Sequence, residues 1–420
     1  MSILIKNVHF NDNITNIHIE GDLIAAIGEA VEADQVIDGT GLVAFPGLVN
    51  THTHAAMTLL RGYGDDMPLF DWLQQKIWPV EAKFTKEDNY WGSKLAILEM
   101  IRSGTTAFND MYFNMEGTAR AADEMGIRAV LAYGFVDLWD EERREREIKG
   151  TIENAKTIGN LNNPRIKPAL GPHAVYTISE EGLQWVREYS DEKNMPVHMH
   201  LSETEKENID CMEKYGVRPA ALLERNGLIN EKLVAAHCVW LDRKEIEMMA
   251  AKGATASHNP VSNAKLAVGN TMPYPLMTEA GLNVGLGTDG TASNNNLDMI
   301  EEMKFAAILQ KLHHNQQTLL PAGEALRMAT ANGAKALGFN AGEIAVGKIA
   351  DIILVRTNIP EFTPMHNATA NLVYAASGRA VDTTICDGKV LMLHGKVEGE
   401  QEIIANASKA ARDLVARASE

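Results

Sequence analysis

The strongest constraint on the fold is a repeated alternation of apolar segments and amphipathic helical segments between residues 47 and 337. Helical periodicity is clear in 87–102, 180–189, 243–250 and 297–312. The segments with the character of buried strands are 43–49, 105–111, 129–136, 166–173, 197–201, 233–239, 254–257 and 284–287. Eight buried strands joined by crossover helices predict an α/β protein with a parallel (β/α)8 barrel of the TIM type.

Both ends of the chain carry β patterns instead. Short apolar or alternating runs lie at 3–8, 17–19, 23–27, 351–355, 372–374, 381–386 and 390–393. Neither set is large enough to be stable alone, and each leaves a hydrophobic face uncovered. We therefore expect a small composite β-sandwich domain from both termini (residues 1–46 and 345–400), a catalytic barrel over 47–344, and an amphipathic C-terminal helix over 401–420.

Side chains that bind metals stand at the ends of the predicted strands. His52 and His54 are two residues apart, so in an extended backbone both side chains leave the same face. One such pair is weak evidence, because short motifs often occur by chance. Related side chains stand at the ends of other strands: His173, His198, His200, Glu203, His237, His258 and Asp289. The carboxyl ends of barrel strands meet on one face, so we expect these side chains to gather there.

A gathered set of buried histidines needs partners, because each unpaired polar ring would cost roughly 1–3 kcal/mol. Three histidines and one aspartate suit a divalent ion; zinc is the expected one, and Fe2+, Mn2+ or Co2+ also fit such ligands. Water on such an ion has a pKa of roughly 7 and supplies hydroxide at neutral pH. A second ion would need a bridging carboxylate or modified lysine at the end of the fourth strand. Lys167 lies at the beginning of that strand, so we expect one ion.

Composition limits the partners and the compartment. The net charge of -17 argues against nucleic acid and disfavours an anionic membrane surface. The chain has no signal-peptide pattern and no run of 18 apolar residues. Cys211, Cys238 and Cys386 are scattered, which excludes a disulfide scaffold and a cysteine-rich zinc site. We expect a cytoplasmic protein that takes a small molecule. Barrels of this size commonly assemble, so we also expect a homo-oligomer, a dimer or tetramer.

Several motifs occur together in an order that resembles the amidohydrolase superfamily. They are 46–54, 197–203, His237, 287–290 and 347–354, and they span nearly the whole chain. Within that superfamily, segments 59–62, 78–81, 171–173 and 200–203 are similar to deaminases of 5′-modified adenosines. These are the 5-methylthioadenosine/S-adenosylhomocysteine deaminases and the 5′-deoxyadenosine deaminases.

The resemblance implies a role for each matching residue. The implied metal ligands are His52, His54, His200 and Asp289. Glu203 would pass a proton to the purine ring, while His237 and Asp289 would orient the attacking water, take its proton and deliver it to the departing ammonia. Glu81 and His173 would bind the nucleoside, most simply through ribose hydroxyls, with Glu203 and Asp289 at the base. The implied reaction is hydrolytic deamination to the inosine analogue, which would salvage by-products of S-adenosylmethionine.

Other candidates are expected to be structural or to line the pocket. His198 should point inward from a lower layer of the barrel, and we expect it to be a packing residue. His258 looks like part of the turn after the seventh strand, where Asn263 would line the pocket. His313 and His314 should lie on the surface, and segment 140–149 should be a solvated helix face.

One departure from the family pattern bears on substrate choice. Members that take S-adenosylhomocysteine hold its carboxylate with arginines, one of them near the end of the third strand. An ungapped count places Tyr133 there, and tyrosine cannot form a bidentate salt bridge. This favours small 5′ substituents, as in 5′-deoxyadenosine, 5′-methylthioadenosine or adenosine itself, although Arg143, Arg144 and Arg146 are within reach as substitutes.

Two alternatives stay open from the sequence. The same metal site could serve a deaminase of guanine or another heterocycle, or a triazine chlorohydrolase. The other alternative is a metal-free scaffold protein without catalytic activity, and the complete set of ligands together with Glu203 argues against it.

Overall fold

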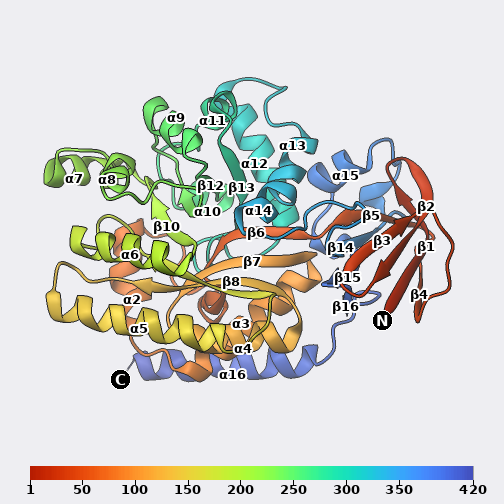
Figure 1. The fold of residues 1–420 in the computed structure, drawn as a ribbon, viewed down its shortest axis with the longest axis horizontal. Helices are drawn as coiled ribbons and strands as arrows, with labels where there is room; N and C mark the ends of the chain where they lie inside the picture. Colours follow the sequence, from red (N-terminus) through yellow and green to blue (C-terminus); the bar gives the residue numbers. More distant parts are fainter. Residues whose placement is uncertain (420) are drawn as a thin grey trace.

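The computed structural model describes residues 1–419 and contains two sheets, one of which is a barrel surrounded by helices (Figure 1). The barrel sheet has eight parallel strands in sequence order. They are β6 (Leu48–Thr53), β7 (Thr105–Tyr112), β8 (Arg128–Phe135), β9 (Ile166–Pro172), β10 (Val197–Leu201), β11 (Leu233–His237), β12 (Thr255–His258) and β13 (Asn283–Leu286). The (β/α)8 barrel predicted from the sequence is confirmed.

The first and last strands of the barrel meet beside the predicted site. The Asp289 amide donates to the carbonyl of His52 at 2.9 Å, and Asn50 Nδ2 donates to Thr288 Oγ1 at 2.8 Å. A Cβ on Gly287 would lie 2.7 Å from the backbone nitrogen of His52, so only glycine permits this approach. The closure brings residues from the two ends of the barrel sequence into contact.

The second sheet combines strands from both termini, as expected, and lies to the right of the barrel in Figure 1. Its order is β16-β15-β14-β5-β1-β2-β3, with β4 paired to β1. The strands are β1 (Ser2–Phe10), β2 (Asn13–Glu20), β3 (Leu23–Ile27), β4 (Gln35–Asp38), β5 (Leu42–Pro46), β14 (Ile352–Arg356), β15 (Val381–Cys386) and β16 (Lys389–Met392). The antiparallel pairing of β5 with β14 joins the two ends of the chain. The exact domain limits at residues 46, 344 and 400 stay predictions.

The buried segment predicted at 43–49, which Pro46 and Gly47 interrupt in the sequence, forms two strands. It is divided between the two sheets, because β5 ends at Pro46 and β6 begins at Leu48. Gly47 is the crossing point, where its amide donates to the carbonyl of Asp351 at 2.8 Å. A Cβ there would lie 2.3 Å from Thr106 Oγ1, so the chain passes from one sheet to the other where no side chain fits.

The strand predicted at 372–374 is wrong, because these residues end helix α15 (Ala368–Tyr374). Asn367 caps that helix by accepting a hydrogen bond from the Ala370 amide at 2.8 Å. A short apolar run does not by itself distinguish a strand from a buried helix, and here the cap decides between them.

Helices cover the outside of the barrel, and a helical segment follows its first strand. The covering helices are α3 (Lys86–Arg102), α4 (Met115–Met125), α5 (Glu141–Gly159), α6 (Glu180–Lys193), α7 (Glu205–Tyr215), α8 (Pro219–Arg225), α9 (Arg243–Ala251), α10 (Pro260–Lys265), α11 (Tyr274–Ala280), α12 (Met299–His314), α13 (Ala322–Met328) and α14 (Ala331–Ala336). The segment after β6 contains η1 (Ala55–Leu60), α1 (Leu69–Trp72), η2 (Leu73–Ile77) and α2 (Trp78–Glu81). Two short turns of helix, η3 (Pro360–Phe362) and η4 (Gly378–Ala380), flank α15.

The predicted C-terminal helix is α16 (Glu400–Ala418), which runs along the lower edge of the barrel in Figure 1. Ion pairs hold it to α3: Arg417 contacts Asp88, and Glu400 contacts Arg102. Among residues 1–419, no helix is long and apolar enough to cross a membrane.

The amino-terminal end of the barrel is joined to the second sheet by buried charges. Arg128, the first residue of β8, lies 2.9 Å from Asp351 Oδ2 and 2.6 Å from Asp387 Oδ1. Asp351 Oδ1 accepts a hydrogen bond from the Asp387 amide at 2.8 Å, and Arg165 lies 3.5 Å from Asp387 Oδ2. Burial alone would lower the pKa of Arg128, but attraction to Asp351 reverses this and raises it. Every charge of this group faces an opposite charge.

Candidate metal centre and active-site pocket

A cavity of about 540 Å³ lies at the carboxyl ends of the barrel strands. It is lined by titratable side chains that the sequence singled out: His54, Glu81, His173, His200, Glu203, His237 and Asp289. The segment after β6 adds an apolar wall of Met57, Trp72, Leu73, Ile77 and Trp78. Residues spread over more than 200 positions of the sequence therefore line a single pocket.

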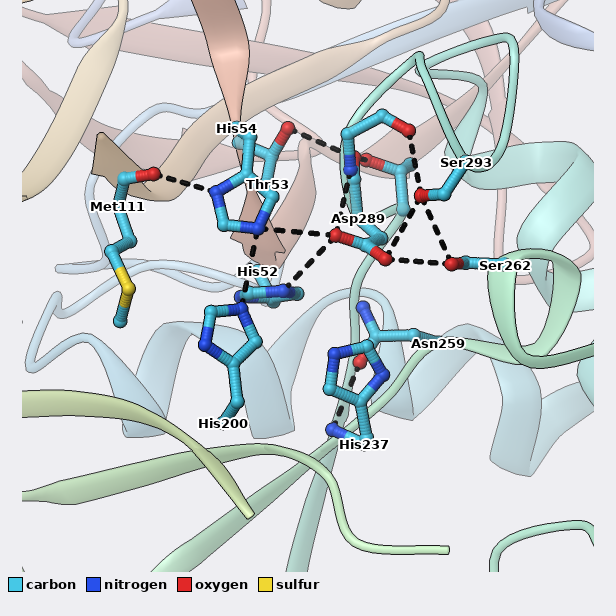
Figure 2. A network of polar contacts seen from close by, with 12 residues as sticks. His52, Thr53, His54, Met111, His200, His237, Asn259, Ser262, Asp289 and Ser293 are labelled. Atoms are coloured by element: carbon cyan, nitrogen blue, oxygen red, sulfur yellow. Dashed lines mark hydrogen bonds and ion pairs between the residues drawn. The ribbon is translucent and has the colours of Figure 1, made fainter. Parts of the chain in front are cut away.

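Three histidines approach one point with the same ring nitrogen (Figure 2). Nε2 of His54 lies 3.3 Å from Nε2 of His200 and 3.3 Å from Asp289 Oδ1. Nε2 of His52 lies 3.3 Å from the same aspartate oxygen. The short distances between these donor atoms are those of ligands that share one ion.

The other ring nitrogen, Nδ1, of His54 and of His200 has a backbone carbonyl as its hydrogen-bond acceptor. His54 Nδ1 lies 2.6 Å from the carbonyl of Met111, and His200 Nδ1 lies 2.8 Å from the carbonyl of His173. A carbonyl only accepts, so both Nδ1 atoms carry the proton and both Nε2 atoms keep a free lone pair. Nε2 of His52 is buried and has no hydrogen-bond partner among the described residues. The donor set therefore fits a divalent ion.

Burial keeps the imidazoles of His52 and His200 neutral, which is the form that binds metals. It lowers the pKa of His52 to about 3 and that of His200 well below its ordinary value. Burial alone would raise the pKa of Asp289, but its contact with His52 outweighs this and holds the pKa well below the usual range. An ionised aspartate beside neutral histidines completes the set.

Asp289 is held on its other oxygen by two serines, which lie to the right of it in Figure 2. Ser262 Oγ donates to Asp289 Oδ2 at 2.6 Å, and Ser293 Oγ does so at 3.0 Å. Oδ1 accepts from the Gly290 amide at 2.8 Å and faces the histidines. These bonds fix which oxygen points toward the centre.

Glu203 and His237 face each other across the pocket wall. His237 Nδ1 lies 2.9 Å from Asn263 Oδ1 and 3.9 Å from Glu203 Oε1. Burial raises the pKa of Glu203, so this carboxyl retains a proton more readily than an exposed one. The Glu203 amide donates to Glu207 Oε2 at 2.8 Å, and the Ser202 amide donates to Oε1 at 2.9 Å. Glu207 thus fixes the backbone that carries Glu203.

Glu81 and His173 present hydrogen-bond acceptors to the pocket. Tyr112 donates its hydroxyl to Glu81 Oε1 at 2.8 Å, while burial raises the pKa of that carboxyl. His173 Nδ1 lies 2.9 Å from Thr177 Oγ1, which itself donates to the carbonyl of Ala174. The threonine oxygen accepts the Nδ1 proton, so Nε2 of His173 is an acceptor. Burial lowers the pKa of this histidine to about 4, so it is neutral.

The ungapped count placed Tyr133 where it would meet the 5′ substituent of the substrate, and this placement is wrong. Its ring points away from the pocket toward α5, where a Cβ on Gly150 would lie 3.0 Å from its hydroxyl. The residues of this segment that line the pocket are Gly134 and Val136. Side chains alternate along a strand, so a shift of one residue reverses the side on which a side chain lies.

Three further predictions concern the arginines of segment 140–149, Lys167 and Asn263. Among the three arginines of the charged segment, Arg143 lines the pocket, and the segment itself forms the first turns of α5. Lys167 lies away from the pocket and donates to the carbonyls of Leu337 and Gly338 at 3.3 and 2.8 Å. Asn263 acts through His237 and does not line the cavity.

Several residues around the site were missed in the sequence. They are Tyr112, Thr177, Glu207, Ser262 and Ser293, each of which bonds to a predicted site residue or to its backbone. Tyr112 and Thr177 stand near strand ends, which was a weak signal. Ser262 carried none, because it becomes a neighbour of Asp289 only in the folded barrel. Ser293 and Glu207 lie four residues from Asp289 and Glu203, and no motif distinguished them from other polar residues.

Comparison with known proteins gives a consistent result. The Amidohydrolase family model matches residues 43–391. A 5′-deoxyadenosine deaminase from Methanoregula boonei is 56% identical over 424 residues, covering 99% of this chain and 96% of that protein. A 5-methylthioadenosine/S-adenosylhomocysteine deaminase from Thermococcus sibiricus is 50% identical over 401 residues, covering 94% of each chain.

Solved structures show the same fold. An adenosine deaminase from Xanthomonas campestris with bound zinc has a TM-score of 0.92 and 35% identity, covering 99% of this chain and 98% of that one. An atrazine chlorohydrolase from Arthrobacter aurescens has a TM-score of 0.88 and 23% identity, covering 97% and 100%. The family model and the near full-length relatives confirm the resemblance found in the sequence: the chain belongs to the amidohydrolase family.

Proposed function

We propose that this protein is a metal-dependent deaminase of 5′-substituted adenosines, which releases ammonia and the inosine analogue. The observation that carries the proposal is that the histidine–aspartate cluster, Glu203 and the acceptor pair Glu81–His173 line the same cavity. The relatives named as 5′-deoxyadenosine and 5-methylthioadenosine/S-adenosylhomocysteine deaminases support the substrate class.

The acceptor pair suits the ribose of a nucleoside. Glu81 keeps one oxygen free after Tyr112 has bonded to the other, and His173 offers the lone pair of Nε2. Two acceptors match two vicinal hydroxyls, which are donors. A bare base such as guanine has no such pair of hydroxyls, so these residues favour a nucleoside over the heterocycle alternatives.

The proposed metal ligands are His52, His54, His200 and Asp289, with a single zinc ion as the expected occupant. A divalent ion there would supply Lewis-acid chemistry and make water nucleophilic at neutral pH. The structure contains two possible ligand groups, His52 with His54 and His200, and His52 with His237 and Asp289. A single ion is proposed because both groups share His52 and because Lys167 is bonded elsewhere.

The proton transfers are assigned to groups of this chain. Glu203, whose pKa is raised by burial, donates a proton to a ring nitrogen of adenine and makes the neighbouring C6 electrophilic. His237, whose Nδ1 is held by Asn263, presents Nε2 to orient the attacking water. Asp289 takes the proton of that water and, with His237, returns it to the departing ammonia. The acid and the base come from different strands, so they can act on different sides of the reacting carbon.

The 5′ substituent should lie near Val136, Leu138 and Arg143, which line the cavity on the side of His173 and Thr177. Arg143 Nε donates to the carbonyl of Val136 at 2.6 Å, and its guanidinium lies 3.9 Å from Glu147 Oε1. Because Glu147 offsets its charge, we expect Arg143 to give only modest help to a substrate carboxylate. Small apolar 5′ substituents are the expected preference.

The decisive test is ammonia release by the zinc-loaded protein from 5′-deoxyadenosine, 5′-methylthioadenosine, S-adenosylhomocysteine, adenosine, guanine and a chlorotriazine. We expect kcat/KM to be highest for the first two. Release from guanine or the triazine, with none from any adenosine, would overturn the substrate assignment. A protein that binds less than about half an equivalent of metal, even after zinc is added, would favour the inactive scaffold.

We base the proposed homo-oligomer on an exposed apolar face of helix α12. Phe305, Ile308 and Leu312 lie on one face of α12 and are 37%, 46% and 75% exposed. An apolar stripe of this kind is typical of an interface, and a second copy of the chain is the proposed occupant. Sedimentation equilibrium measures the result: a monomer at micromolar concentration would contradict it.

A further inference from the structure

His52 differs from the other two ligand histidines in the partner of its Nδ1. For His54 and His200 the acceptor is a backbone carbonyl, which no substitution removes. For His52 it is the side chain of His198, whose Nε2 lies 2.8 Å away. The one outer contact of the three histidines that mutation can delete is therefore the contact with His198.

The geometry of this pair is well defined. His52 comes from β6 and His198 from β10, and their rings are nearly perpendicular at 86°, with centroids 4.9 Å apart. Both residues are buried, with exposures of 0% and 1%. A separation of 2.8 Å between two ring nitrogens requires one proton between them, so one ring donates and the other accepts.

The direction of that bond decides whether His52 can bind a metal. If His52 donates from Nδ1, its Nε2 lone pair points to the centre shared with His54, His200 and Asp289. If His198 donates instead, the proton of His52 is on Nε2 and faces Asp289 Oδ1, 3.3 Å away, where it blocks the ion. Only the first arrangement is a ligand, and it requires His198 to accept.

Nothing else bonded to His198 opposes the accepting form. Its other ring nitrogen, Nδ1, is buried and has no hydrogen-bond partner among the described residues, so no second partner compels this ring to donate from Nε2. The contact therefore runs from His198 through His52 to the centre. A hydrogen bond from an outer residue of this kind fixes ring orientation and tautomer in many metal sites.

We propose that His198 is a positioning residue of the metal centre, which accepts the Nδ1 proton of His52 and so keeps the Nε2 lone pair of His52 directed at the ion. The inference rests on the proposed metal site and adds to it a residue expected from the sequence to be packing only. His198 does not touch the ion or the substrate; it acts through His52.

The test is zinc affinity, measured by competition with a chelator at constant pH and without any nucleoside. His198→Met keeps a similar length but removes the acceptor, and should raise the zinc Kd by roughly 10- to 100-fold. His198→Gln places an amide oxygen near the position of Nε2 and should stay within about threefold of wild type. The visible absorption of the cobalt-loaded protein should change in the methionine variant and not in the glutamine variant.

A buried histidine elsewhere in the barrel provides the control. His258, at the end of β12, is 1% exposed and neither of its ring nitrogens has a hydrogen-bond partner among the described residues. His258→Gln should leave zinc affinity unchanged. Thermal unfolding of each variant without metal reports any general loss of packing.

The possible results distinguish a failure of the proposed role of His198 from a failure of the proposed deaminase function. Wild-type affinity in His198→Met, equal losses in the methionine and glutamine variants, or a similar loss in His258→Gln would each overturn the role of His198 while leaving the deaminase proposal intact. A wild-type protein that binds no zinc would overturn both. Zinc binding without ammonia release from any adenosine would overturn only the function.

Discussion

The two ends of the barrel both bury polar side chains, but they leave them in opposite states. At the amino-terminal end, Arg128 is paired with Asp351 and Asp387, and these contacts join the barrel to the second sheet. At the carboxyl end, Nε2 of His52 is buried without a hydrogen bond and faces a shared centre. In the first group every charge is paired with an opposite charge of the chain, whereas in the second a buried nitrogen needs a partner, such as a metal ion, that the chain does not supply.

This difference separates structural from functional burial. Backbone conformation does not separate the two ends, since His237 and Asp289 adopt positive φ values of 71° and 63° at the carboxyl end and Asp387 adopts 56° in the amino-terminal group. A buried polar atom without a partner costs free energy, and where several donor atoms converge on one centre a bound ligand can provide the missing contact. Substitutions at the two ends should therefore affect different measurable properties.

Removing a ligand at the carboxyl end should give the largest effect. His200→Ala deletes one of the four proposed donors, and turnover should fall by at least about 1,000-fold, because a bound ion contributes several kcal/mol to the reaction. Metal content, measured by atomic emission, should fall with it. Chelation of the wild-type protein should abolish activity and added zinc should restore it, whereas zinc should not rescue the variant. His313→Ala, an exposed position on α12, is the control and should behave as wild type.

Glu203→Gln should have the next largest effect, because it removes the acid while keeping shape and metal. Loss of a general acid lowers kcat by roughly 100-fold or more, with KM and zinc content nearly unchanged. Steady-state kinetics with 5′-deoxyadenosine provide the measurement. Unchanged turnover would remove Glu203 from the mechanism, and a rise in KM alone would restrict it to binding.

Arg128→Met tests the amino-terminal end, where the expected loss is in stability. Removing Arg128 leaves Asp351 without an opposite charge and Asp387 with Arg165 alone, and breaking a buried pair in this way costs about 3–5 kcal/mol. The midpoint of urea unfolding should fall, while kcat of the folded protein stays within about twofold of wild type. Arg165→Met is the matched control and should lose less, since Arg165 lies at 3.5 Å from Asp387. A loss of kcat with normal stability would contradict the division between the two ends.

The sequence was sufficient where a pattern is local or repeated. The alternation of strands and helices predicted the barrel, and histidines at successive strand ends predicted the cluster, because parallel strands end on one face. The two terminal β patterns predicted one shared sheet by the same reasoning, since each lacked a cover for its apolar face.

The other features of the fold and of the site depend on contacts that sequence patterns do not reveal. The break at Gly47 was visible in the sequence, but the close approach of Thr106, which leaves no room for a side chain there, was not. The direction of the Tyr133 side chain depends on a register of one residue. The serines that hold Asp289 come from helix α10 and from the turn after Asp289. His198 was expected to be a packing residue. Its spacing from His200 shows on which face of the strand its side chain lies, but does not show that its Nε2 contacts Nδ1 of His52.

The smallest predicted effect compares two similar tyrosine–carboxylate pairs, one inside the pocket and one outside it. Tyr112 donates to Glu81 Oε1 at 2.8 Å, and Tyr90 donates to Glu124 Oε2 at 2.6 Å on the outside of the barrel. Tyr112→Phe should raise KM for the nucleoside by about 2- to 10-fold, the scale of one hydrogen bond, because Glu81 is then less well oriented. Tyr90→Phe should change neither KM nor kcat. A fall in kcat without a change in KM for Tyr112→Phe would place Tyr112 at the reacting carbon, and equal effects of both variants would show that the contrast comes from folding alone.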